Sequence, residues 1–240
     1  NFLFNHFNYF TKNFDDEIIS NIFQALFMAT KINVENVSNE SNLLPFEIGE
    51  MLMQNSNILM VIVNFLSDHR KCYVKSAIGI ISNLVCFGEQ YIKIIVEFDA
   101  LAKFANLITH SNADVQYRVS SAIKTITAQN VLYIQQVIDY GLIPLLVECL
   151  YFGCYKTQCE ITYIMFNISQ NGTNVQMNYL FNMNNAIPNM DVFDGMATML
   201  TYHPEIVMCA LKLYSNLLIR SKELAVNEYV ITKLRESSAY

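Results

Sequence analysis

An acid, an aromatic ring and an amide recur at helical spacing in the stretch EITYIMFNISQNG, residues 160–172. Glu160, Tyr163 and Asn167 stand at positions i, i+3 and i+7, so a helix presents all three on one face. A carboxylate beside an aromatic ring can hold the charged head and the alkyl stem of a Lys or Arg side chain. A side-chain amide can hydrogen-bond the main chain of an extended peptide. The stretch therefore predicts one rung of a peptide-binding surface.

The amide belongs to a series along the chain. Asn83, Thr125 and Asn167 follow one another at steps of 42 residues, and Asn216 follows after a step of 49. Their settings are similar: IISNL, KTITA, MFNIS and YSNLL. Thr125 is the weaker substitute in the series, and we assign the longer last step to an irregular stretch at 189–196. A fixed period in this range is the signature of stacked repeats.

Helices must supply these repeats. The chain has only 7 Gly and 4 Pro, and its apolar residues recur at spacings of three and four. Each amide-bearing helix is followed by a helix, a turn with small residues and a second apolar helix, which makes three helices per period. One such unit cannot bury its apolar face alone, whereas stacked units share a continuous core. The sequence therefore predicts an all-α fold, a right-handed superhelix of armadillo repeats.

The repeats are predicted to form a single array over residues 1–240. Within its leading part, a third helix is expected at 13–32 and a polar loop at 33–42, and residues 226–236 are expected to start a further repeat. The predicted segments are a partial leading repeat at 1–56, four full repeats at 57–98, 99–141, 142–185 and 186–228, and the start of a terminal repeat at 229–240.

In an armadillo array the third helices line a concave groove. We expect Asn83, Asn167 and Asn216 to hold the main chain of an extended peptide there, with Thr125 contributing less. An alternative remains open, in which these amides tie neighbouring helices together. One turn earlier on the same face, at the height suited to an aromatic sandwich, stand Gly79, Ser121, Tyr163 and Lys212.

Composition argues against several other classes of protein. The net charge of -6 disfavours non-specific binding of nucleic acid, which needs a basic surface. The most apolar run, residues 58–66, is too short to cross a bilayer. We therefore predict neither nucleic acid nor membrane as a partner.

No catalytic, metal or cofactor site is predicted either. Cys149, Cys154 and Cys159 are five residues apart, which matches no common zinc spacing, and the cysteines are expected to be buried free thiols. The four histidines fall in different predicted repeats, and no phosphate loop or nucleophile elbow occurs. The chain is therefore not expected to be an enzyme.

Several stretches resemble the C-terminal half of importin alpha, the family of adaptors that bind nuclear localisation signals. ITAQNVLYIQQVIDYGLIPLLVECL resembles its passage from the seventh to the eighth repeat, and TQCEITYIMFNISQNGT resembles the next third helix. PEIVMCALKLYSNLLIRSKE is similar to the ninth repeat, SAIGIISNLV to the sixth and DDEIISNIFQALFM to the fifth. The resemblance extends over nearly the whole chain and is loosest at 33–60.

The resemblance implies a nuclear import adaptor that works in the cytoplasm and the nucleus, with importin beta and an export factor as further partners. A basic signal peptide would lie antiparallel in the groove, held by Trp sandwiches, Asn clamps and acidic residues. Asn83, Asn167 and Asn216 match the clamp positions, and Glu160 matches the acidic position of the eighth repeat. The alternative is an armadillo scaffold that binds a different protein partner.

The chain departs from the family pattern in one respect above all, because it contains no Trp. The two Trp positions of the family's minor site hold Ser121 and Tyr163, and the fifth-repeat Trp position holds Gln24. Arg118 stands at the acidic position of the seventh repeat and Thr125 at its clamp. A lost sandwich and an added cation both weaken binding of a basic peptide. The minor site is therefore predicted to be eroded.

Overall fold

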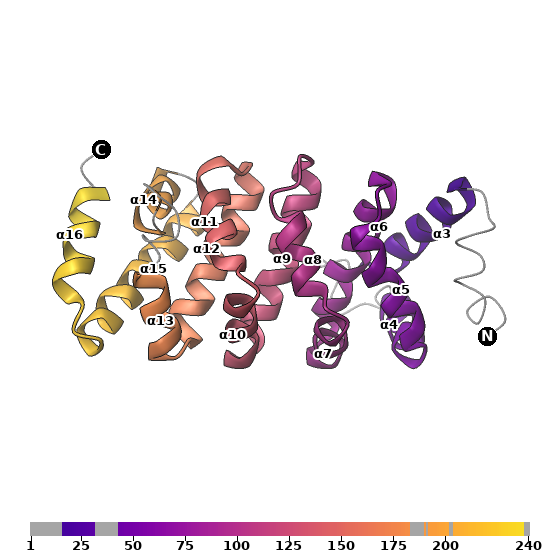
Figure 1. The fold of residues 1–240 in the computed structure, drawn as a ribbon, viewed down its shortest axis with the longest axis horizontal. Helices are drawn as coiled ribbons and strands as arrows, with labels where there is room; N and C mark the ends of the chain where they lie inside the picture. Colours follow the sequence, from indigo (N-terminus) through magenta and orange to yellow (C-terminus); the bar gives the residue numbers. More distant parts are fainter. Residues whose placement is uncertain (1–15, 32–42, 183–189, 191, 202–203, 238–240) are drawn as a thin grey trace. The chain divides into compact units, whose positions relative to one another are not determined.

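A computed structural model of the chain describes residues 16–31, 43–182, 190, 192–201 and 204–237. These residues form helices joined by short turns, with no strand among them (Figure 1), which confirms the predicted all-α fold. The chain divides between Leu107 and Ile108 into two compact units, and each is described here by itself.

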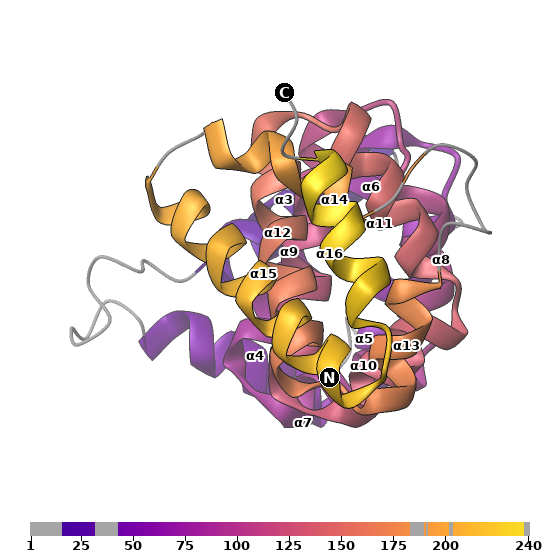
Figure 2. The ribbon, with the colours of Figure 1, turned by 90° about the vertical axis from the view of Figure 1, so that its left-hand side faces the viewer.

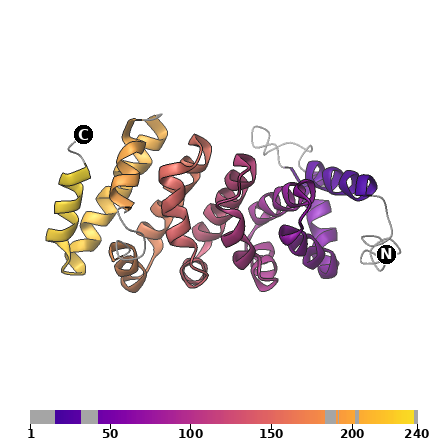
Figure 3. The same cartoon turned by 45° about the horizontal axis from the view of Figure 1, so that its top comes forward.

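The first unit consists of short helices around the longer α3 and α6. Helix α3 lies beside α6 (Figure 3). The helices are α3 (Asp16–Ala29), α4 (Leu43–Gln54), α5 (Ser56–Asn64) with the 3-10 turn η3 (Phe65–Ser67), α6 (Lys71–Leu84) with the 3-10 turn η4 (Val85–Phe87), α7 (Glu89–Glu97) and α8 (Ala100–Leu107).

Helix α6 is central to this unit because its apolar residues recur at helical spacing. Tyr73, Ala77, Ile81 and Leu84 are all at most 1% exposed. The ring of Tyr73 lies 5.2 Å from that of Phe65 in an edge-to-face arrangement, which is a favourable geometry for aromatic pairs. Residues 76–82 of α6 are all buried, so this part of the helix is enclosed on every side and lies at the centre of the unit.

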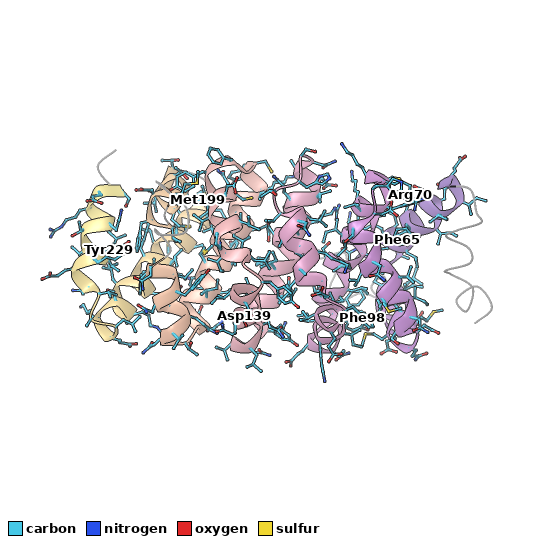
Figure 4. The ribbon with its side chains drawn as sticks, in the orientation of Figure 1. Phe65, Arg70, Phe98, Asp139, Met199 and Tyr229 are labelled. Carbon is cyan, nitrogen blue, oxygen red and sulfur yellow. The ribbon has the colours of Figure 1, made fainter. Side chains whose placement is uncertain are left out.

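A compact polar cluster precedes α6. The carboxylate of Asp68 accepts hydrogen bonds from the main-chain N–H of Arg70 at 2.8 Å and from its guanidinium at 2.8 and 2.9 Å. The guanidinium lies 4.1 Å from the ring centroid of Tyr73, and Figure 4 shows Arg70 at the same end of the unit as Phe65. The hydrogen bonds from Arg70 hold the pKa of Asp68 below its usual value, against the opposing effect of burial.

The second unit contains three long helices and several shorter ones. Helix α12 packs against both α9 and α15, and α16 packs against α14 and α15 at the C-terminal end (Figure 2). The helices are α9 (Ala113–Gln129), α10 (Val131–Asp139), α11 (Leu142–Phe152), α12 (Tyr155–Asn171), α13 (Asn174–Phe181), α14 (Val192–Ala197) with the 3-10 turn η6 (Thr198–Thr201), α15 (Pro204–Glu223) and α16 (Asn227–Ser237).

The helices agree with several expectations and correct one. Helix α3 lies within the predicted third helix at 13–32, and α16 coincides closely with the predicted start of a repeat at 226–236. The expected irregular stretch at 189–196 was wrong in part, because residues from Val192 onward form α14 and bury Phe193 and Met196. The expected loop at 33–42 lies outside the described residues. The repeat boundaries and the single array remain predictions.

None of the described helices is by itself both long and apolar enough to cross a bilayer. Helices α10 and α11 reach that length only when taken together, and they are bent by 83° relative to each other.

Candidate peptide-binding face

Helix α12 presents the three residues of the predicted rung on one side. Ile161, Ile164, Met165 and Ile168 are fully buried on the opposite side and anchor the helix in the core. Glu160, Tyr163 and Asn167 are half-buried on the remaining side. The helical periodicity therefore places them together as expected, and their surroundings come from the neighbouring helices α9 and α15.

The amides of the series bind neighbouring third helices. Asn83 Nδ2 donates to Phe27 O on α3 at 3.2 Å and to Thr30 Oγ1, just after the end of α3, at 3.1 Å. Asn167 Nδ2 donates to Lys124 O at 3.1 Å and to Thr127 Oγ1 at 3.3 Å on α9. The Nδ2 groups of these amides therefore tie neighbouring helical segments together, as the alternative interpretation predicted.

Asn216 continues the pattern with a single bond. Its Nδ2 donates to Ser169 Oγ on α12 at 3.1 Å. Ser169 and Thr127 stand two residues after Asn167 and Thr125 respectively, so they share the 42-residue step. These hydroxyl residues were not among the predicted site residues, although their shared step of 42 positions is visible in the sequence.

The hydrogen-bond pattern fixes which way the amides face. The hydroxyl of Thr30 donates to the carbonyl oxygens of Leu26 and Phe27, at 3.0 and 3.2 Å, and that of Thr127 to those of Ile123 and Lys124, at 2.9 and 3.0 Å. The hydroxyl of Ser169 donates to Phe166 O at 2.8 Å. A carbonyl oxygen only accepts, and a hydroxyl whose hydrogen is already donated must accept as well. The NH2 group of each amide therefore points at the neighbouring helix. Within the described residues no hydrogen bond is recorded to the Oδ1 atoms of Asn83, Asn167 and Asn216.

Thr125 does not take the place of an amide. Its hydroxyl donates to Ser121 O in its own helix at 3.1 Å. A threonine in a helix commonly makes this bond to the carbonyl four residues earlier. The hydroxyl of the series is also missing at one position, because Val85 stands two residues after Asn83, where Thr127 and Ser169 follow Thr125 and Asn167.

Glu160 and Tyr163 already contact a cation of the same chain. Lys124 Nζ lies 2.6 Å from Glu160 Oε2 and 5.6 Å from the ring centroid of Tyr163. The Glu160 side chain is 13% exposed and that of Lys124 is 33% exposed. Burial raises the pKa of Tyr163, with a smaller opposing effect of Lys124. Sequence spacing gave no sign of this pairing, since Lys124 comes from α9.

The other positions at the aromatic height differ from one another. Gly79 is buried against the ring of Phe27, and a Cβ atom there would lie 2.7 Å from that ring. Ser121 is half-buried and Lys212 is exposed. At the family's acidic position, Arg118 Nε lies 3.4 Å from Asp114 Oδ2 within α9. Tyr163 is therefore the single aromatic residue of this row.

The cysteines differ from the expectation that they are buried. All are free; Cys149 and Cys209 are buried, whereas Cys72, Cys86 and Cys154 are exposed. Among the described residues no group of three or more His, Cys, Asp and Glu side chains is placed to hold a metal ion.

Comparisons with known proteins identify the fold. No family model and no curated protein sequence matches the chain. A designed armadillo repeat protein is 21% identical with a TM-score of 0.72, over 94% of this chain and 84% of that one. A computationally designed armadillo repeat protein for modular peptide recognition is 21% identical with a TM-score of 0.74, over the same shares. A third, in complex with the peptide (KR)4, is 19% identical with a TM-score of 0.70, over 94% of each chain. These likenesses confirm the predicted armadillo fold.

Proposed function

We propose that this chain is a non-enzymatic armadillo-repeat scaffold that binds an extended peptide segment of a partner protein along α9, α12 and α15. The observation that carries the proposal is the orientation of the amides on the third helices. In Asn167 the NH2 group is held by α9, so its Oδ1 is pre-oriented and open to an N–H of a bound main chain. A group held in its bound orientation loses little conformational entropy when a ligand arrives.

The first candidate for the partner is a protein carrying a basic nuclear localisation signal, as in importin alpha. The resemblance of the third helices to that family supports it. A structural neighbour of 19% identity was solved with the peptide (KR)4. With this partner the chain would act in nuclear import, with importin beta and an export factor, in the cytoplasm and the nucleus.

The second candidate is a different protein partner, and the charges of the face favour it. Lys124 on α9 already pairs with Glu160, and Lys212 is exposed on α15, so a ligand cation meets a filled carboxylate and a further positive charge. Like charges brought together disfavour a strongly basic ligand. A peptide that is neutral where it crosses these helices meets no such repulsion.

Calorimetric titration with the peptide (KR)4, at low and high salt, tests the proposal. We expect binding that weakens with salt, because exposed charges are screened. Asn167→Ala should weaken binding about 5- to 10-fold through the lost main-chain hydrogen bond. Thr162→Val is the matched control, since Thr162 is buried on the same helix and donates within that helix to Gln158 O, without bonding Asn167. It should leave the affinity unchanged.

The absence of (KR)4 binding at either salt concentration would favour the second candidate. A displayed library of random peptides would then be screened on the same protein. Failure to recover any peptide whose binding depends on Asn167 would end the proposed function altogether.

A further inference from the structure

The Glu160–Tyr163 pair is built like a receptor for a basic side chain. A buried carboxylate needs a cation, because an unpaired buried charge is costly. An aromatic face within about 6 Å adds attraction for the same cation. Lys124 supplies both contacts, at 2.6 Å from Glu160 Oε2 and 5.6 Å from the Tyr163 ring centroid.

The lysine is held in place from its main chain as well as its side chain. Its carbonyl oxygen accepts a hydrogen bond from Asn167 Nδ2 at 3.1 Å. Lys124 therefore contacts Glu160 and Tyr163 through its side chain. Its main chain is held by the amide of Asn167 on the same helix as that pair. A ligand that binds at Asn167 meets Lys124 beside it.

Among the described residues, Lys124 is the cation that forms an ion pair with Glu160. The side chain of Arg118 is engaged with Asp114 within α9. Lys212 is exposed on α15, and Glu205 at the start of that helix raises the pKa of Tyr163, after the larger effect of burial. Burial raises the pKa of Tyr117, and the charge of Glu160 raises it further.

We propose that Lys124 determines which side chain of a bound peptide is accepted at this rung. This inference rests on the proposed function. With Lys124 in place, the acid–aromatic pair is closed to a Lys or Arg of the ligand, and the peptide residue that lies there carries no positive charge. A ligand cation must displace Lys124, and the displaced ammonium group stays within reach and repels it. Without the charge of Lys124, the same pair becomes a site for a basic residue.

The test compares Lys124→Met with the wild-type chain in binding fluorescent (KR)4 at constant low salt, measured by anisotropy. Met keeps most of the alkyl stem and removes the charge. We expect about 10-fold tighter binding, from the acid and the ring together. Lys93→Met on α7 is the control for net charge, since Lys93 is exposed and belongs to the other unit. It should change the affinity less than about 2-fold, because Lys124 and not Lys93 is the lysine that contacts Glu160 and Tyr163.

A second substitution ties the gain to the proposed contact. Adding Glu160→Gln to Lys124→Met should remove the gained affinity. Circular dichroism checks that each variant folds, and Lys124→Gln replaces Lys124→Met if the latter does not.

The outcomes separate the two proposals. If the wild-type chain binds (KR)4 and Lys124→Met binds it no more tightly than Lys93→Met does, the role of Lys124 is wrong and peptide binding stands. If neither the wild-type chain nor Lys124→Met binds (KR)4, the role of Lys124 is equally overturned. In that case the random-peptide screen alone decides the proposed function.

Discussion

The side-chain amide of Asn167 lies 3.1 Å from the carbonyl oxygen of Lys124, whose own ammonium group lies 2.6 Å from Glu160 on the helix of Asn167. Helices α9 and α12 are thus joined by two polar contacts at Lys124. In one, Asn167 of α12 donates to the main chain of α9, and in the other the ammonium group of Lys124 on α9 pairs with Glu160 of α12. They fix the register of one helix against the other while leaving the carbonyl oxygen of the amide outward. The proposed peptide binding and the packing of α12 on α9 therefore involve the same few side chains.

The hydroxyl of Ser169, which accepts a hydrogen bond from Asn216, is predicted to stabilise the second unit. Ser169 is buried, accepts from Asn216 Nδ2 at 3.1 Å and donates within its helix. Ser169→Ala should lower the free energy of unfolding by about 1 kcal/mol, the usual net value of one hydrogen bond. Urea unfolding followed by circular dichroism measures it.

Ser82→Ala is the matched control for that substitution. Ser82 is also a buried serine of a third helix and donates to Gly79 O at 3.0 Å, but no bond from another helix to it is recorded. We expect a smaller loss of stability. Equal losses in the two variants would show that the bond from Asn216 contributes nothing.

The ion pair between Lys124 and Glu160 is expected to show measurable coupling. A double-mutant cycle with Lys124→Met and Glu160→Gln should give about 1 kcal/mol, decreasing with salt because a third of Lys124 is exposed. The pair of Asp114 and Arg118, within one helix and at 3.4 Å, should give less than about 0.5 kcal/mol. Equal coupling in both pairs would contradict the special position of Lys124.

Acid should weaken the first unit through Asp68. Hydrogen bonds from Arg70 lower its pKa in the folded chain below the ordinary value of 3.8. A carboxyl whose pKa is lowered by folding contributes stability at pH values above its unfolded pKa of 3.8. That stability is lost as the pH falls through the lower pKa of the folded chain. Asp68→Asn should cost about 1–3 kcal/mol at neutral pH, as expected for hydrogen bonds to a charged group.

The same variant reports the pH dependence. Urea unfolding at neutral pH and at about pH 3 should give a smaller difference for Asp68→Asn than for the wild-type chain, since the titrating carboxyl is gone. An unchanged difference would mean that other acids account for the acid sensitivity.

The thiols should react with iodoacetamide in a fixed order. Burial alone would raise the pKa of Cys154, but hydrogen bonds from Thr157 and the charge of Lys156 outweigh it and lower the pKa below 9.0. Burial raises the pKa of Cys149 and of Cys209 to about 11. Because the thiolate is the reactive form, Cys154 should be alkylated first at neutral pH. Peptide mapping by mass spectrometry gives the order.

Thr157→Val tests the cause of that order. The substitution removes the hydroxyl that lies 3.4 Å from the sulfur of Cys154 and should slow its alkylation. Reaction of Cys149 or Cys209 ahead of Cys154 in the folded chain would contradict the assignment.

The helices and their faces were within reach of the sequence. Periodicity is a local property, so the spacing of apolar residues along 161–168 was enough to place Glu160, Tyr163 and Asn167 on the other side of α12. The 42-residue step predicted stacked three-helix repeats, because units that cannot bury their apolar faces alone must share them.

The partners of those side chains were decided by the tertiary structure. Asn167 is the same amide whether it faces a ligand or the next helix, and only the packing of α12 on α9 turns its NH2 group to the carbonyl of Lys124. Glu160 and Lys124 are 36 positions apart, from 124 to 160, and no spacing rule joins them. By itself the sequence determined the helices, their period and their polar faces. The tertiary structure decided which polar groups are already paired, because such pairing depends on distances between helices that local periodicity does not specify.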